Sequence, residues 1–315
     1  MCKKVALICG VSGQDGGYLA SFLLDKGYDV WGTSRDAQGS SFSNLEQLGI
    51  KENVKLLSLL PEDFRSVLAA LHKSQPDELY YLAGQSSVSL SFEQPAETIQ
   101  SIAIGMLNVL EACRMLGTQV RIYSAGSSEC FGGKGRIAAT ELTSFQPRSP
   151  YAVAKASAFW LVDSYREAYN LFVCTGILFN HESPHRPSRF VTQKIISTAK
   201  RIANGSDEKL ILGRLDISRD WGWAPEYVEA MWLMLQQDQA EDFVIATGEL
   251  NSLENFVDTV FSQLGLDWKE HVIQNEEFMR PTDLEISFGD PSKAKKKLNW
   301  QAQYKMRDVV KMMME

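Results

Sequence analysis

Residues 5–20, VALICGVSGQDGGYLA, decide the fold of this chain. A short apolar run typical of a buried strand leads into a glycine-rich turn, and a helical pattern follows the turn at once. This order lets the backbone approach a pyrophosphate at the N-terminus of a helix. The G-x-x-G-x-x-G spacing is one residue longer than the usual fingerprint, so an ordinary turn between a strand and a helix remains an alternative. The turn residues predicted to bind a dinucleotide are Gly10, Gly13, Gln14, Asp15 and Gly16.

Strand-like and helix-like segments alternate along most of the chain. The apolar runs that favour strands cover 4–9, 29–33, 54–59, 78–82, 120–124, 172–178 and 242–248. The segments that favour helices cover 17–26, 62–74, 99–115, 151–169, 191–203 and 225–237. Such alternation predicts an α/β fold, a Rossmann-type doubly wound parallel sheet with helices on both faces.

The pattern changes after about residue 180. Residues 181–190, HESPHRPSRF, contain two prolines and little periodicity, which predicts a loop. We therefore expect residues 1–179, with about 224–249, to form the dinucleotide-binding domain. Residues 180–223 and 250–315 are expected to form a smaller, non-contiguous C-terminal lobe that binds the substrate.

The composition is that of an ordinary soluble globular protein, with 44% hydrophobic and 23% charged residues in a chain of 315. A net charge of -7 argues against a nucleic-acid partner, because phosphates select for basic surfaces. No unbroken apolar run reaches the roughly 18 residues of a membrane-span candidate. The five cysteines form no C-x-x-C pair and are odd in number, so we expect neither a disulfide framework nor a zinc site, and a cytoplasmic location.

Tyr151 and Lys155, in the segment SPYAVAK, lie four residues apart in a predicted helix and therefore share one face. A tyrosine in water has a pKa near ~10, and a neighbouring ammonium group favours the phenolate and lowers that pKa. Such a phenolate can take a hydroxyl proton while a hydride leaves the same carbon. A surface pair with this spacing is common, and the glycine turn earlier in the chain is what favours the catalytic interpretation.

Ser127, Ser128 and Glu129 closely follow the predicted strand 120–124. Ligands bind outside the carboxyl ends of strands in open parallel sheets, so a serine there can hydrogen-bond the reacting oxygen, and Glu129 is a candidate second acid or base. The alternative is that the serines cap a turn and Glu129 faces solvent.

Arg35 lies just past the second predicted strand, where an acidic residue would bind a ribose hydroxyl. A cation at this place favours a 2′-phosphate, which predicts NADP rather than NAD. Asp36 beside it weakens the preference, and a solvated loop charge is the alternative.

Many further segments, from about residue 5 to residue 300, are similar to segments of a known protein family. They are GVSGQDGGYLA, LAGQSSV, SFEQP, SAGSSECFG, PRSPYAVAKA, REAYNLF, GILFNHESP, RFVTQKI, RDWGWAPEYVEAMW, EDFVIATG, RPTD and KAKKKLNW. The chain resembles the extended short-chain dehydrogenase/reductase family and, within it, the GDP-mannose 4,6-dehydratases. NHESP with FVTQKI and RDWG is far more specific than the glycine turn. The resemblance implies NADP-dependent dehydration of GDP-mannose to GDP-4-keto-6-deoxymannose, which is a lyase reaction.

The resemblance also implies catalytic roles. Ser127, Tyr151 and Lys155 match the family's Ser/Thr, Tyr and Lys, and Glu129 matches its glutamate. Tyr151 is expected to act as the base while hydride leaves C4 of the sugar. Glu129 is expected to take the C5 proton as the C6 hydroxyl leaves as water, before the hydride returns to C6. A simple reductase or 4-epimerase needs only the Ser-Tyr-Lys set, so the glutamate favours elimination.

Binding roles follow from the same matches. The expected GDP-sugar ligands, besides Ser127, are Ser86, Asn180, Lys194, Arg219 and Arg280. The expected NADP-side residues, besides the glycine turn, Arg35, Tyr151 and Lys155, are Leu82, Gln85, His181 and Arg186.

Some segments depart from the family pattern. Residues 60–63, LPED, replace the frequent G-D-L-x-D, and LAGQSSV replaces L-G-A-Q-S-H-V. Alternatives therefore remain: dehydration of another nucleotide sugar such as a GDP-heptose, reduction of GDP-4-keto-6-deoxymannose, and a non-catalytic dinucleotide-sensing scaffold. Loss of the Tyr or Lys would favour the scaffold, and this chain keeps both.

Two further features concern metals and assembly. Residues 181–185 match the zinc-protease motif H-E-x-x-H, but Pro184 interrupts the helix that this motif requires, so no metal site is predicted. In relatives the loop equivalent to 35–45 reaches a neighbouring subunit, and helices equivalent to 99–115 and 151–169 dimerise. The resemblance therefore implies a homodimer or homotetramer.

Overall fold

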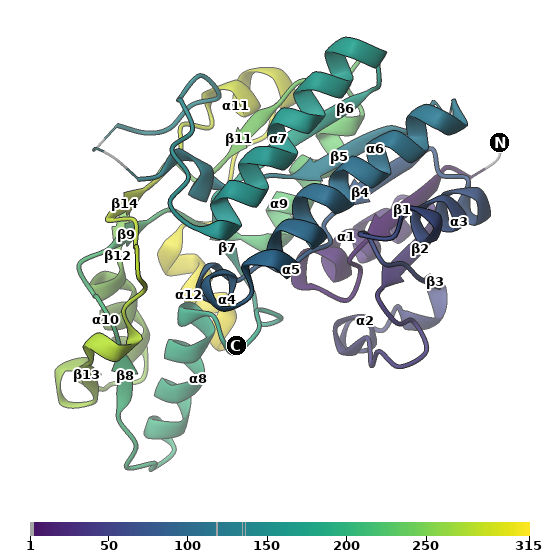
Figure 1. Cartoon of the computed structure of the whole chain (residues 1–315). Helices are drawn as coiled ribbons and strands as arrows, with labels where there is room; N and C mark the ends of the chain where they lie inside the picture. Colours follow the sequence, from purple (N-terminus) through teal and green to yellow (C-terminus); the bar gives the residue numbers. More distant parts are fainter. Residues whose placement is uncertain (1–2, 118, 134, 136) are drawn as a thin grey trace.

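The computed structural model describes residues 3–117, 119–133, 135 and 137–315. Its centre is a parallel sheet in the order β11-β6-β5-β4-β1-β2-β3, with helices on both faces (Figure 1). The strands of this sheet are β1 (Val5–Cys9), β2 (Asp29–Ser34), β3 (Lys55–Ser58), β4 (Glu78–Tyr81), β5 (Arg121–Ala125), β6 (Val173–Leu178) and β11 (Phe243–Ile245). Each neighbouring pair is parallel, which confirms the predicted Rossmann-type doubly wound sheet.

Helices connect these strands and build the C-terminal part of the chain. They are α1 (Gln14–Asp25), α2 (Ser43–Gln47), α3 (Phe64–Ser74), α4 (Val88–Glu93), α5 (Pro95–Ile99), α6 (Gly105–Leu116), α7 (Pro150–Tyr169), α8 (Val191–Ala203), α9 (Ala224–Leu235), α10 (Leu253–Gln263), α11 (Ser292–Leu298) and α12 (Met306–Met314). The π-helical turn η2 (Gln100–Ile104) joins α5 to α6, and single 3-10 turns are η1 (Lys51–Asn53), η3 (Ser128–Phe131), η4 (Trp268–Glu270) and η5 (Glu276–Phe278).

Small strands lie outside the main sheet. They are β7 (Asn180–Glu182), β8 (Leu210–Leu212), β9 (Ser218–Arg219), β10 (Trp221–Trp223), β12 (Asn251–Ser252), β13 (Val272–Gln274) and β14 (Ile286–Ser287). β7 pairs with β10, and β9 lies between β12 and β14. The predicted loop 181–190 therefore begins with a strand. Segments of two or three residues are too short to show a periodic pattern, which is why the sequence does not indicate these strands.

Two apolar cores hold the helices on the sheet. On one face α1 and α9 pack together, with Leu23 and Met231 in the core. On the other face α3, α6 and α7 contribute Val67, Val109 and Ala158. Because the sheet is covered on both sides, strands such as β4 and β6 are buried along their whole length rather than at alternate residues.

A third core builds the C-terminal lobe, where α8, α10 and α12 bring Ile195, Phe256 and Val309 together. The segment around α11 does not join it: Leu298 and Trp300 pack in the core of α1 and α9. We therefore propose that this segment belongs with the sheet domain, and that the other predicted domain boundaries stand.

The run Pro95–Leu116 is long and apolar enough to cross a membrane, judged by length and composition alone. Polar residues interrupt the apolar ones in this segment, so the sequence shows no unbroken apolar run there. In the structure 44% of its most apolar 18-residue window is buried inside the protein. The run packs against α3 and α7 as part of the cover of the sheet.

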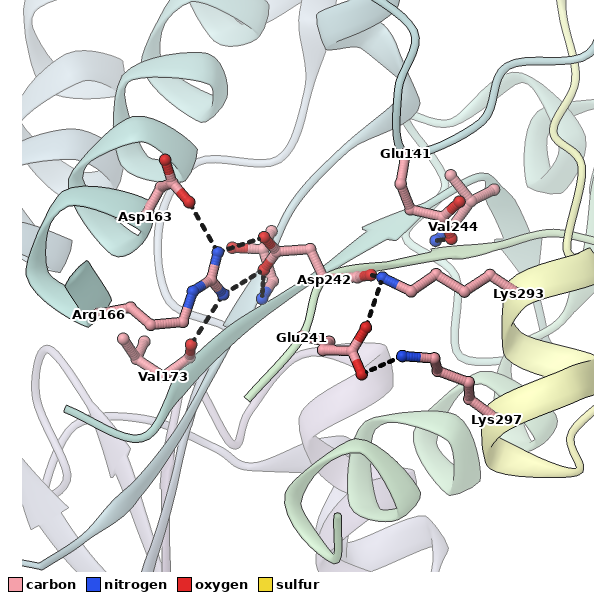
Figure 2. A network of polar contacts seen from close by, with 10 residues as sticks. Glu141, Asp163, Arg166, Val173, Glu241, Asp242, Val244, Lys293 and Lys297 are labelled. Atoms are coloured by element: carbon pink, nitrogen blue, oxygen red, sulfur yellow. Dashed lines mark hydrogen bonds and ion pairs between the residues drawn. The ribbon is translucent and has the colours of Figure 1, made fainter. Parts of the chain in front are cut away.

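Figure 2 shows a polar network that fastens one edge of the sheet. Arg166 on α7 donates hydrogen bonds to the Asp242 carboxylate at 2.7 and 3.0 Å and to the carbonyl of Val173 at 3.1 Å. Lys293 on α11 donates to the carbonyl of Asp242 at 2.7 Å and pairs with Glu241 at 3.2 Å. Charged side chains thus join α7, β6, β11 and α11.

Candidate active site

A cavity of about 360 Å³ lies outside the carboxyl ends of β4, β5 and β6, between the sheet domain and the C-terminal lobe. The predicted site residues that line it are Asp15, Leu82, Ser86, Ser127, Glu129, Tyr151, Lys155, Asn180, His181, Arg186, Lys194, Arg219 and Arg280. The fold thus brings every residue predicted to act in catalysis or to hold substrate to one cavity.

Tyr151 and Lys155 stand on the first turns of α7. Ser149 caps the helix by accepting a hydrogen bond from the amide of Ala152 at 3.1 Å. The ammonium of Lys155 donates to the carbonyl of Ala125 at 2.7 Å and lies 5.8 Å from the centre of the Tyr151 ring. Burial lowers the pKa of Lys155 to about 8.

The pKa of Tyr151 does not follow the sequence prediction. Burial raises it well above its usual value, and the hydroxyl of Ser127 opposes that rise. The ammonium of Lys155 hydrogen-bonds the carbonyl of Ala125, and burial is the larger influence on the phenol.

Ser127 and Glu129 follow β5 in the turn η3. Ser127 accepts a hydrogen bond from the amide of Glu129 at 3.3 Å, so the serine does cap a turn. Glu129 lines the cavity rather than facing solvent. Burial raises the pKa of Glu129, while the guanidinium groups of Arg219 and Arg280 lower it. The carboxyl is therefore a stronger base than an ordinary glutamate.

Arg219 and Arg280 share one carboxylate at the lobe side of the cavity. Arg219, which is only 5% exposed, donates to Asp283 at 2.9 Å, and Arg280 lies 3.6 Å from the same oxygen. Desolvation lowers the pKa of Arg219, and Asp283 opposes that effect. Both guanidinium groups line the cavity, and their forked N–H donors suit a diphosphate.

A buried polar cluster ties the glycine turn to β7. The two ring nitrogens of His181 lie 2.9 Å from the Asp15 carboxylate and 2.7 Å from the carbonyl of Phe179. Burial lowers the pKa of His181, but the charge and hydrogen bond of Asp15, with the hydrogen bond to Phe179, together outweigh it, and the net shift is upward. Burial raises the pKa of Asp15, and His181 brings it down to about 2. His181 lies on a strand, so H-E-x-x-H does not form the helical zinc geometry.

The glycine turn fits a dinucleotide. Gly10 has a φ of +92°, and a Cβ at Gly16 would lie 2.4 Å from the carbonyl oxygen of Gly10, so both positions require glycine. A Cβ at Gly13 would meet only that carbonyl, at 3.5 Å, which leaves space beside the turn. No side chain caps the first amides of α1. Open space next to uncapped helix amides is what a pyrophosphate needs.

Six predicted cofactor residues lie outside the cavity lining: the turn residues Gly10, Gly13, Gln14 and Gly16, and the more distant Arg35 and Gln85. Arg35 is exposed and pairs with Glu97 at 2.9 Å. The side-chain Nε2 of Gln85 donates to the carbonyl of Ser87 at 2.7 Å and to the hydroxyl of Thr98 at 3.2 Å. Gln85 therefore supports the turn that precedes α4.

Residues 7–313 match the family model described as GDP-mannose 4,6 dehydratase. The chain belongs to this family. It is 46% identical to GDP-mannose 4,6 dehydratase 2 of Arabidopsis thaliana over 323 aligned residues, which cover 99% of this chain and 86% of the relative.

Solved structures share the fold of this family member at lower identity. The dTDP-glucose 4,6-dehydratase of Bacillus anthracis, in complex with NAD, superimposes with a TM-score of 0.85 at 17% identity and covers 98% of this chain and 95% of its own. RMD from Pseudomonas aeruginosa, complexed with NADPH, gives 0.81 at 21% identity, with 99% and 98% covered. These neighbours bind nicotinamide dinucleotides on the same fold.

The structure of this dehydratase-family chain also reveals cavity residues that the sequence analysis missed. They are Arg189, Arg214, Ser89, Phe278 and Asp283, among others. Basic residues clustered around the start of α8 are a signal that could have indicated Arg189. Ser89 gives no such signal, because its place depends on a contact with a residue 191 positions away.

Proposed function

We propose that the chain dehydrates GDP-mannose to GDP-4-keto-6-deoxymannose, with a tightly held NADP. The observation that carries the proposal is a half-buried carboxyl, Glu129, in the same cavity as Ser127, Tyr151 and Lys155. A reductase of the same fold needs only the last three side chains. We infer the substrate from membership of the family, and we infer the elimination of water from the carboxyl of Glu129.

The dinucleotide, when bound at the glycine turn, supplies a hydride acceptor that later returns the same hydride. Tyr151 takes the proton of the C4 hydroxyl, and the charge of Lys155 stabilises the phenolate that results. Ser127 donates a hydrogen bond to the C4 oxygen. Oxidation at C4 acidifies the C5 proton, which Glu129 takes and passes to the C6 hydroxyl as that group leaves as water. When the hydride returns to C6, C5 takes up a proton from solvent, which balances the proton that Tyr151 took from the C4 hydroxyl.

We assign diphosphate binding to Lys194, Arg219 and Arg280, with Asn180 beside them. Arg219 and Arg280 share one acidic partner, as described above. Lys194 donates only to the carbonyl of Ile211, at 2.6 Å, in the described contacts, so its charge remains available for an anion. Ser86, exposed at the start of the α4 segment, is assigned to the sugar side of the cavity.

For the cofactor we propose NADP rather than NAD. Arg35 is held only by an exposed ion pair with Glu97, and such pairs contribute about 0–1 kcal/mol. The guanidinium can therefore turn toward a 2′-phosphate at little cost. Mass spectrometry of the cofactor released by denaturing the purified protein checks this, and release of NAD alone would contradict it.

We also propose a cytoplasmic homo-oligomer that pairs through α6 and α7. These helices lie side by side on one face of the sheet (Figure 1). Apolar side chains remain exposed on them and on η2, among them Ile104, Val153 and Trp160. The thiols of Cys9, Cys130 and Cys174 are buried and form no disulfide in the described chain, as expected in a reducing compartment.

The decisive experiment incubates purified protein with GDP-mannose and no added reductant. Mass spectrometry should show the sugar nucleotide losing the mass of one water, with no net change in NADPH. If only a GDP-heptose lost water, the GDP-heptose would replace GDP-mannose as the assigned substrate. Reaction only with a 4-keto sugar and added NADPH would replace dehydration by reduction.

A further inference from the structure

One contact bridges the mouth of the cavity. The Nε of Arg280 donates to the hydroxyl of Ser89 on α4 at 3.1 Å. Arg280 belongs to the C-terminal lobe, while Ser89 belongs to the sheet domain, and both line the cavity. Each side of the cavity therefore contributes one partner to a single hydrogen bond.

The other serines of this segment have different partners. Ser87 caps α4 by accepting from the amide of Leu90 at 3.3 Å, and Ser91 donates to the carbonyl of Val88 at 2.6 Å. Both serve the helix itself. Among the described contacts of these three serines, the side-chain hydrogen bond that leaves the segment is that of Ser89.

The backbone around Arg280 is held independently of Ser89. Thr282 donates to the carbonyl of Arg148 at 2.7 Å, and Asp283 accepts from Arg219 at 2.9 Å. The Arg280 side chain, by contrast, is 30% exposed, and in the described part of the chain it has one hydrogen bond, to Ser89, and one 3.6 Å ion pair, with Asp283. Removal of the Ser89 hydroxyl should therefore release the guanidinium without detaching the segment.

We infer that Ser89 is a positioning residue for substrate binding, which holds the guanidinium of Arg280 over the diphosphate of the nucleotide sugar. The inference rests on the proposed function of Arg280. Arg280 loses rotamer freedom before the ligand arrives, so less ordering remains to be done on binding. A phosphate interaction made equally in the ground and transition states changes KM and leaves kcat nearly unchanged.

The test compares Ser89→Ala, Ser89→Thr and the exposed control Ser262→Ala on the holoenzyme. Ser89→Ala should raise KM for GDP-mannose, and Kd for GDP measured by calorimetry, about five-fold, which is the value of one ordinary hydrogen bond. The kcat should stay within a factor of about two. Ser89→Thr should restore both constants, and Ser262→Ala should change neither.

A second arm repeats Ser89→Ala in an Arg280→Gln background, where the effect on the Kd for GDP should disappear because the two residues act as a unit. Full additivity of the two changes, or an unchanged Kd in Ser89→Ala, would overturn the inference. If the unmodified protein bound GDP but did not dehydrate GDP-mannose, the proposed reaction would fail while the coupling of Ser89 to Arg280 remained measurable.

Discussion

Glu129 is a carboxyl on which burial and two guanidinium groups act in opposite directions. If Glu129 removes the C5 proton, Glu129→Gln should still allow oxidation at C4. It should lower the rate of water loss by a factor of about 10²–10⁴, which is what a positioned general base usually contributes to a rate. Stopped-flow absorbance should then show reduced nicotinamide accumulating. Glu254→Gln, on the exposed face of α10, serves as the control. Normal turnover of Glu129→Gln would exclude the assigned role.

The pH dependence of kcat should reflect two shifted groups. Burial raises the pKa of Glu129, so the base becomes protonated, and kcat falls, at a higher pH than for an ordinary glutamate. Burial lowers the pKa of Lys155 to about 8, so kcat should also fall as pH rises through about 8 and the ammonium is lost. A pH-rate profile checks both limbs. Lys155→Arg keeps its charge and should move the alkaline limb upward, whereas an unmoved limb would point to another group.

At the scale of single residues, the sequence indicated the catalytic side chains but not the side chains that contact them. Ser127, Glu129, Tyr151 and Lys155 each follow a strand or begin a helix, which local patterns reveal. Asp283, the acid that Arg219 and Arg280 share, was not singled out, because a shared partner is a property of the folded chain.

Among the elements, α7 and β11 are joined by Arg166 and Asp242, whose side chains are 19% and 13% exposed. Arg166→Met should lower the free energy of unfolding by about 2–3 kcal/mol, because Asp242 keeps its charge without its guanidinium partner. Urea unfolding measures the loss. Arg166→Met combined with Asp242→Asn should recover part of it. If the double variant were no more stable than the single one, an unpaired charge would not be the cause.

The pair of Asp15 on α1 and His181 on β7 should stabilise the fold in a pH-dependent way. The pKa of His181 is raised in the folded state, so its contribution is complete below the unfolded value near ~6.5 and is lost as pH rises through the folded value. The coupling energy from Asp15→Asn, His181→Asn and the double variant should therefore be larger at pH 6 than at pH 9. Equal coupling at both values would mean that His181 does not change its protonation state between them.

Which elements could be predicted depended on their length. The strands of the main sheet and the long helices were predicted within a few residues, because each shows apolar runs or a helical period. The start of α1 was predicted at Gly17 and lies at Gln14, since helix N-termini rich in glycine carry no periodic signal. β7 and β10 pair across 41 positions and have three residues each, so no local pattern could indicate them.

For the whole molecule, the exposed apolar surface of α6 and α7 predicts an interface between two copies of the chain. Trp160, 58% exposed on α7, should lie within it. Trp160→Glu should convert the oligomer to a smaller species in sedimentation velocity. Tyr304→Glu, at a side chain 43% exposed near α12, should leave the sedimentation coefficient unchanged. A wild-type protein that sediments as a monomer would exclude the interface.

The network of Figure 2 has a consequence for how the chain is made. Translation delivers β6 long before β11, its neighbour in the sheet, and α11 follows later still. Until residue 245 has left the ribosome, β6 presents an unpaired edge to other nascent chains, and strand edges of this kind recruit partners. Lys293 and Lys297, which pair with Glu241 beside β11, are made only after this interval has ended. The growing polypeptide is therefore most vulnerable to aggregation between the emergence of β6 and the emergence of β11.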